Sequence, residues 1–402
     1  MSRLFVLIIA CSVAISGLAA ASPPSQAERF LHDGRFAEGE TALLLALDAN
    51  PSNDEARFGL AVIQFVRAVE NLGRALHEYG AVSDNATLPL LRLPVPMHER
   101  PSAISHKALG QVLDAFATEL DRAESTLAGV KDDDVKLKLR LSNVTFDFTG
   151  NGKDRTTLLE LRTSSNGERP GFQKVSPDIR VHFDRGDVAW LRAYCHLLCA
   201  IVEGYRAVDE EAWFDLWARK IFPKVEVVSN EREDSRFHGL RVVDSRRLRR
   251  MRLHLVMVCE LNRETWTHIR KETDDDHEWL PHPTQSDQFG LPLTDALIEA
   301  WLWMMAQWEA LLKGERLFPA NHIRQAFPEH EFGQGLNLKN LLDDPPADLS
   351  FDYERIKAAG IDAKYLEAER GKQVFDVMAF LALNQRNAAL FGFTYVPGST
   401  SP

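Results

Sequence analysis

The chain has 402 residues, of which 45% are hydrophobic and 26% charged, and its formal net charge at pH 7 is -11. This is the composition of an ordinary globular protein, and the length favours two or three domains over one. The acidic balance argues against general binding of nucleic acid. After the N-terminal region, no stretch reaches the roughly 20 apolar residues of a membrane-spanning helix, so we expect no transmembrane segment.

The N-terminal residues have the pattern of a secretory signal peptide. Arg3 precedes an unbroken apolar stretch over residues 4–10, and small residues fill positions 19–21. This order of charge, apolar stretch and cleavage site predicts that residues 1–21 are removed. We therefore expect an extracytoplasmic protein, in the periplasm if the host is a bacterium. Cys11 leaves another interpretation open, a lipoprotein processing site at which acylation would anchor the chain.

Residues 27–61 carry the clearest local pattern. Gly34, Phe36, Leu43, Ala46 and Pro51 have the offsets of turn, packing and terminating residues in a helical repeat. The pattern resembles the second helix of a tetratricopeptide repeat. This resemblance covers about residues 27–80 and implies packed helix pairs with a groove for another protein.

The segment that follows is predicted to be one long helix over residues 54–79. Its apolar residues alternate spacings of four and three, which places them on one stripe, and Gly80 follows as a stop signal. An exposed groove would use apolar side chains of this region. The candidate partner-binding residues are Phe36, Leu43, Phe58 and Phe65. The alternative is that these helices only cap the core.

The remaining pattern predicts a mainly α fold with a small β element near residues 135–183. Alternation of Leu137, Leu139 and Leu141 with basic residues is typical of a strand, and a second strand is expected at 178–183. Asp187 is the expected N-cap of a helix over 188–207. Further helices are expected at 102–130, 208–220, 245–272, 294–313, 351–369 and 371–391.

These elements suggest three regions after the signal peptide. The expected regions are a tetratricopeptide-like helical part at 22–130, a β-containing insertion at 131–186 and a helical C-terminal domain at 187–402.

The loop that begins at Asp147 resembles the start of an EF-hand calcium loop. Oxygen-bearing side chains occupy the first, third and fifth positions, and Gly152 permits a sharp turn at the sixth. Leu158 stands at the twelfth position, where an EF-hand has glutamate. The candidate calcium ligands are Asp147, Thr149, Asn151, Lys153 through its backbone carbonyl, and Glu160. A plain polar turn is the alternative, since Gly and Asn already favour one.

Three other groups of residues could carry chemistry. His277 and His282 flank a glutamate, a tryptophan, a leucine and a proline in an acidic segment, and could form a metal site in a loop. Cys195, His196 and Cys199 offer zinc ligands, although the cysteines also suit a buried core. The arginine-rich run 246–252 could meet an anionic membrane surface, or pair with acidic helices within the chain. With Cys259, three cysteines follow the signal, so the chain is no disulfide scaffold.

The leading prediction is a non-enzymatic extracytoplasmic helical scaffold that binds another protein, and calcium would stabilise it if the 147–154 loop holds an ion. One alternative is a metal-dependent enzyme of hydrolase type, which would join the 147–154 loop to Asp184 and Asp187, or would use His277 and His282. Another is a peripheral membrane-associated factor that uses the 246–252 arginines. No P-loop, GxGxxG or GxSxG motif is present, so the sequence names no catalytic residue.

Overall fold

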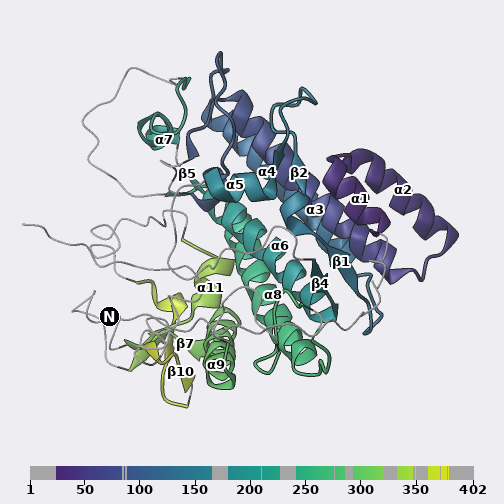
Figure 1. The fold of residues 1–402 in the computed structure, drawn as a ribbon. Coiled ribbons are helices and arrows are strands. Elements are labelled where there is room, and N and C mark those ends of the chain that lie inside the picture. The colour runs from purple at the N-terminus through teal and green to yellow at the C-terminus, as the bar shows by residue number, and fades with distance from the viewer. Residues whose placement is uncertain are drawn as a thin grey trace, which may run out of the picture.

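A computed structural model gives the fold of the chain (Figure 1). The structure describes residues 24–83, 86, 88–164, 180–209, 211–226, 241–275, 277–285, 293–320, 333–346, 349, 361–371, 373–377 and 379. The described part is mainly helical with small two-stranded sheets, which confirms the predicted fold class. The expected signal peptide and Cys11 lie outside the described residues.

Three helices form the N-terminal part: α1 (Gln26–Asp33), α2 (Phe36–Ala49) and α3 (Asp54–Glu78). Gly34 ends α1 in the left-handed region, at φ 61°, which glycine adopts without a steric penalty. Asn53 caps α3 by accepting the backbone N–H of Ala56 at 3.0 Å. The long helix predicted over 54–79 is confirmed. Nothing beyond packed helices identifies a tetratricopeptide repeat, so that resemblance stays a prediction.

The centre of the molecule is a layer of three helices: α4 (His106–Leu127), α6 (Arg185–Arg206) and α8 (Ser245–Ile269). α6 packs against both α4 and α8, and α3 packs against α4 (Figure 1). One buried apolar cluster joins α4 and α6 to the C-terminal half of α3, and a second joins α1, α2 and α3 to the strands. This layer positions both groups of side chains that are described below.

The predicted β element is present between the helices. β1 (Leu137–Leu139) pairs antiparallel with β4 (Val181–Phe183), so that Leu137 lies opposite Phe183. β2 (Thr145–Phe146) and β3 (Thr156–Thr157) also pair antiparallel and close the loop between them. α5 (Leu158–Ser164) follows β3.

Further helices complete the described chain, of which the first joins the apolar cluster of α4 and α6 and the other two pack against α8. These helices are α7 (Glu211–Ala218), α9 (Asp295–Leu312) and α11 (Leu338–Asp343). The remaining strand pairs of the described chain are β5 (Val208–Asp209) with β6 (Arg241–Val242), β7 (Arg316–Leu317) with β10 (Gln373–Val374), and β8 (Gln334–Leu336) with β9 (Leu366–Ala368). Short 3-10 helices lie at Pro89–Arg92, Leu141–Asn143 and Ala363–Tyr365.

Two helix predictions are wrong in part of their described residues. The segment predicted as a helix over 351–369 contains a 3-10 turn, capped by Asp362, and then β9, which pairs with β8. In the segment predicted as a helix over 371–391, Gly371 has φ 84° and β10 pairs with β7, and helical residues follow at 377 and 379. Residues 351–360 and 381–391 lie outside the described residues. Pairing with distant strands overrides the local helical pattern here.

The start of α6 also differs from the prediction. Asp184, not Asp187, is the N-cap, so the helix begins three residues earlier than expected. Asp187 is instead the third residue of the helix, and its side chain accepts the backbone N–H of Asp184 at 3.1 Å. The two aspartates form a reciprocal capping box, which satisfies otherwise orphaned amides.

Candidate metal centre

Three buried carboxylates meet at the N-terminus of α6. Asp184, Asp187 and Glu278 each offer an oxygen, and these oxygens lie within 4.8 Å of one another. Their residues are 8%, 3% and 2% exposed. We call these three residues the carboxylate cluster. Two of them come from α6 and its cap, and the third comes from the segment that follows α8.

Helix capping uses only one carboxylate oxygen of each aspartate. Asp184 Oδ1 accepts the backbone N–H groups of Gly186 and Asp187, at 2.6 and 3.2 Å. Asp187 uses Oδ2 for the reciprocal bond, but its Oδ1 is buried and has no hydrogen bond to any described residue. A buried acceptor without a donor costs about 1–3 kcal/mol, so the position of Asp187 Oδ1 calls for a ligand.

Glu278 is directed into the cluster by its backbone. His277 lies at φ 68°, in the left-handed region that only some residues other than glycine adopt. Its carbonyl accepts the backbone N–H of His182 at 3.2 Å, which ties the segment to β4. The ring of Trp279 packs against Phe183 and Trp190, with centroids 5.8 and 5.7 Å apart. Aromatic packing therefore fixes the residue that follows Glu278 against β4 and α6.

Like charges raise the pKa values of this region. Burial, with Asp184 second, raises the pKa of Asp187 well above its ordinary value. Burial, followed by Asp184 and Glu278, raises the pKa of the neighbouring Glu272 to about 10. Lys136 Nζ lies 3.9 Å from Glu278 Oε1 and also pairs closely with Asp274. Because Lys136 is shared with Asp274, acidic groups outnumber this ammonium among the described residues of the site, and burial makes an ionised carboxylate there unfavourable.

The donor set fits a hard divalent cation. Calcium takes six to eight oxygens at 2.3–2.6 Å, so oxygens on opposite sides of it lie about 5 Å apart. The separations within the cluster are compatible with that geometry. Soft thiolate or imidazole donors are not among the three ligating residues, which favours Ca²⁺ over Zn²⁺ here.

In the predicted calcium loop, side-chain oxygens accept hydrogen bonds from the loop's own hydroxyl and backbone N–H groups. Asp147 Oδ1 accepts the hydroxyl of Thr149 at 3.1 Å, and Oδ2 accepts the backbone N–H of Gly152 at 2.9 Å. Asn151 Oδ1 accepts the backbone N–H groups of Lys153 and Asp154, at 2.7 and 2.9 Å. These bonds are those of a polar turn, and the loop needs no ion to form.

Two further contacts involve the predicted calcium ligands Asp147 and Glu160. The guanidinium of Arg74 lies 3.7 Å from Asp147 Oδ2 and donates to the backbone carbonyl of Asp147 at 2.8 Å. Glu160 accepts the backbone N–H and the hydroxyl of Thr157, at 2.7 and 2.9 Å, so it caps its own segment. Hydrogen bonds within the loop join Asp147, Thr149 and Asn151 to one another, and Glu160 bonds to Thr157. Calcium binding in this loop stays a prediction.

The candidate partner-binding residues lie in the interior. Phe36, Leu43 and Phe58 are buried in the N-terminal apolar cluster. Phe65 is half-buried, and its ring centroid is 6.0 Å from that of Tyr194 on α6. These side chains stabilise the packing of the N-terminal helices, and partner binding through them stays a prediction.

The other predicted metal ligands do not assemble as expected. Within the described chain, no group of three ligating side chains contains His277 or His282, or joins Asp184 and Asp187 to the 147–154 loop. His282 Nδ1 is 2.8 Å from the hydroxyl of Thr284. Cys195, Cys199 and Cys259 are buried free thiols.

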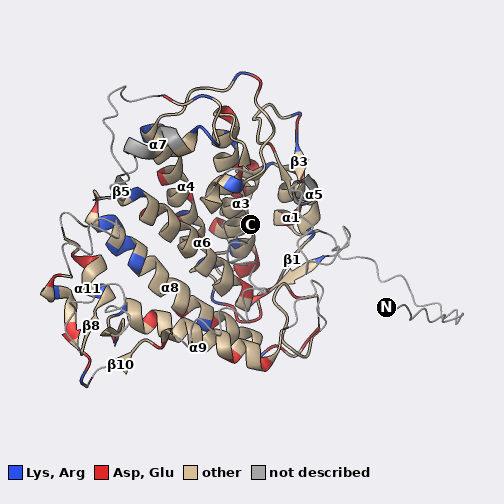
Figure 2. Ribbon diagram, turned by 90° about the vertical axis from the view of Figure 1, so that its left-hand side faces the viewer, with Lys and Arg blue, Asp and Glu red and all other residues tan. Residues whose placement is uncertain are grey.

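The basic run is largely paired within the molecule. It occupies the first turns of α8, where Figure 2 shows blue segments beside acidic neighbours. Arg247 lies 3.0 Å from Asp114 and 3.2 Å from Glu203, and Arg250 lies 2.9 Å from Glu203. Arg252 is buried and donates to Asp343 and to the backbone carbonyl of Leu312, which ties α8 to α11 and α9. Membrane-surface contact through this run stays a prediction.

No membrane-crossing candidate is found among the described helices, none of which is both long and apolar enough. Sequence reasoning did note Asp184 and Asp187, and separately the acidic segment at 274–278, but missed that Glu278 joins them. The signal in the sequence is that Glu278 precedes Trp279, and an acidic residue beside a tryptophan is a weak signal by itself.

No protein-family model, curated protein or solved structure matches this chain. The chemistry of its own side chains is therefore the basis for assigning a function.

Proposed function

We propose that this protein is an extracytoplasmic helical protein whose carboxylate cluster binds Ca²⁺. The observation that carries the proposal is the unpartnered Oδ1 of Asp187, buried beside the carboxylates of Asp184 and Glu278. A divalent cation there supplies the missing partner and offsets the like charges. The proposal keeps the expected calcium dependence and moves the ion from the 147–154 loop to α6.

The role of the ion is to fasten one segment to another. Asp184 and Asp187 belong to the start of α6, whereas Glu272 and Glu278 belong to the chain beyond the end of α8. A shared cation holds this later segment against β4 and α6. Extracellular calcium modules bind with dissociation constants of about 0.1–1 mM, so a site with only a few protein carboxylates suffices outside the cytosol.

A calorimetric titration of Ca²⁺ into the metal-stripped protein tests this assignment. The informative variant is Glu278→Gln, which keeps the shape of the side chain and removes its charge. The matched control is Asp274→Asn, since Asp274 is an exposed acid of the same segment that pairs with Lys136. We expect saturable binding to the wild type and to Asp274→Asn, and at least tenfold weaker binding to Glu278→Gln.

Stability measurements give a second readout. A ligand at one hundred times its dissociation constant adds about 2.7 kcal/mol to the free energy of unfolding. We expect that increment in wild type and Asp274→Asn, but not in Glu278→Gln. Absence of calcium binding to the wild type, or equal binding by Glu278→Gln, would rule out the carboxylate cluster as the site.

A further inference from the structure

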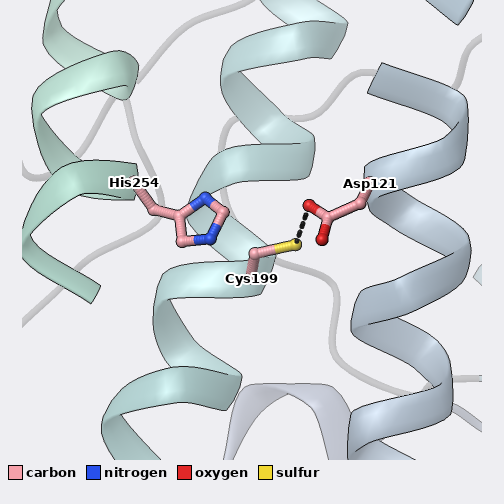
Figure 3. Close-up of side chains that lie close together, drawn as sticks. All are labelled: Asp121, Cys199 and His254. Atoms are coloured by element: carbon pink, nitrogen blue, oxygen red, sulfur yellow. Dashed lines mark hydrogen bonds between the residues drawn. The ribbon is translucent and has the colours of Figure 1, made fainter. Parts of the chain in front are cut away.

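A second group of ligating side chains lies in the middle of the helical layer. Asp121 on α4, Cys199 on α6 and His254 on α8 turn toward one another from three separate helices (Figure 3). Their ligating atoms all lie within 4.8 Å. We call these three residues the three-helix centre. It shares no residue with the carboxylate cluster.

The geometry is already close to that of a coordination site. Cys199 Sγ lies 3.5 Å from Asp121 Oδ1 and 3.7 Å from the backbone carbonyl of Ala117. With metal–ligand bonds of 2.0–2.3 Å, two ligands of a tetrahedral zinc ion are about 3.5 Å apart. The cysteine and the aspartate thus have the spacing that a shared ion requires, and a ring nitrogen of His254 lies within 4.8 Å of both.

The orientation of His254 is fixed by a second histidine. His254 Nδ1 is 2.8 Å from His196 Nδ1, and His196 Nε2 is 3.6 Å from Glu124 Oε1. Because Nδ1 is engaged with His196, Nε2 is the nitrogen that faces a ligand. In many metal sites, the histidine nitrogen that does not bind the metal is held in this way by a carboxylate or another polar group.

We propose that the three-helix centre binds a borderline divalent transition metal, with Zn²⁺ as the expected ion, through Cys199 Sγ, His254 Nε2 and a carboxylate oxygen of Asp121. Sulfur, imidazole nitrogen and carboxylate oxygen together are a zinc ligand set, which a calcium site does not use. A thiolate and a carboxylate also neutralise the two charges of the ion within the helical layer.

Three protein ligands leave one tetrahedral position for water or another small ligand. Asp121 is exposed, whereas Cys199 is buried and His254 half-buried, so the fourth position opens toward the Asp121 side. Zinc sites with three protein ligands and an open position are typical of catalytic rather than structural centres. The open position would accept a hard anionic or carbonyl oxygen.

Binding requires the thiol proton to leave. Burial and the neighbouring Asp121 raise the pKa of the Cys199 thiol, so the metal-free centre holds a protonated sulfur. Burial, with His196 second, lowers the pKa of His254, which keeps that imidazole neutral and ready to coordinate. The metal displaces one proton from sulfur to solvent, and the apparent affinity therefore rises with pH.

Cobalt titration tests the proposal, because Co²⁺ replaces Zn²⁺ and gives a thiolate-to-cobalt absorption band. We expect one equivalent of Co²⁺ to produce that band, and Zn²⁺ to remove it. The informative variant is Cys199→Ala, and the matched control is Cys195→Ala, which removes a buried thiol one helical turn away. The band should vanish in Cys199→Ala and persist in Cys195→Ala.

The variant Asp121→Asn is a second test that should not disturb folding, because Asp121 is exposed. We expect it to retain the band with at least tenfold weaker affinity. No thiolate-to-cobalt band in the wild type, or an unchanged band in Cys199→Ala, would overturn the proposal. Glu278→Gln should leave the cobalt band intact, so failure of this proposal and failure of the calcium proposal are separable.

Discussion

The 147–154 loop and the carboxylate cluster are both acidic, yet they use their oxygens differently. The side-chain oxygens of Asp147 and Asn151 accept bonds from their own loop, and Arg74 adds a positive charge beside them. In the carboxylate cluster, Asp187 keeps one buried oxygen without a donor. On our proposal, counting acids in a short segment does not locate a cation. Counting acceptor oxygens that lack donors is more informative.

The difference follows from how each group is assembled. A contiguous loop must first satisfy its own backbone amides, and glycine, asparagine and aspartate do so by forming turns. The carboxylate cluster combines residues far apart in the sequence, and α6 with its cap already fixes two of them. Rigid elements can therefore hold like charges together, where a free loop would let them separate.

The largest expected effect concerns pH. Glu272 has an ordinary pKa near 4.5 in the unfolded chain, and burial beside Asp184 and Glu278 raises its pKa to about 10 in the folded protein. Its protonated form therefore favours folding below pH 4.5, and this stability is lost as the pH rises toward 10. One such group changes the free energy of unfolding by up to about 1.4 kcal/mol per pH unit. The raised pKa of Asp187 acts in the same direction.

Urea unfolding at several pH values, in the presence of a chelator, measures this effect. We expect Glu272→Gln to be more stable than the wild type at pH 8 and equal to it at pH 4, because glutamine cannot ionise. Saturating Ca²⁺ should reduce the loss in the free energy of unfolding that the wild type shows as the pH rises. A Glu272→Gln variant that is destabilised at pH 8 would contradict the description of the cluster as a site of like-charge repulsion.

A smaller effect is expected for the loop. Asp147→Ala removes two hydrogen bonds made by a buried carboxylate, so we expect a loss of about 2 kcal/mol in the free energy of unfolding. The increment that Ca²⁺ adds should remain, since the loop already satisfies its own oxygens. Thermal unfolding with and without Ca²⁺ measures both quantities. Loss of this calcium-dependent increment would indicate that the ion binds in the loop and not at α6.

Much of the central fold could be predicted from the sequence. The apolar stripe of α3, the alternation around β1 and the strand at β4 are local patterns, and the structure confirms each of them. The start of α6 was misplaced because Asp184 and Asp187 are both acceptable caps, and only their mutual bonds decide the order. Segments 366–368 and 373–374 form strands through distant partners, which a local pattern does not reveal.

The sites were less predictable than the fold. Asp184 and Asp187 could be singled out as candidate ligands, but the approach of Glu278 depends on how the segment after α8 returns to β4. Asp121, Cys199 and His254 lie on three helices without any shared motif, and only the packing of α4, α6 and α8 brings them together. Donor types can be read from a sequence, whereas their convergence is a tertiary property.

Terbium luminescence is the most direct test of the calcium site. Tb³⁺ replaces Ca²⁺ at oxygen sites and emits when a nearby indole transfers energy to it, and Trp279 adjoins Glu278 with Trp190 beside it. We predict saturable emission that Ca²⁺ displaces, that Glu278→Gln abolishes and that Asp147→Ala leaves unchanged. Emission that survives in Glu278→Gln and disappears in Asp147→Ala would contradict the assignment of the cation to the start of α6.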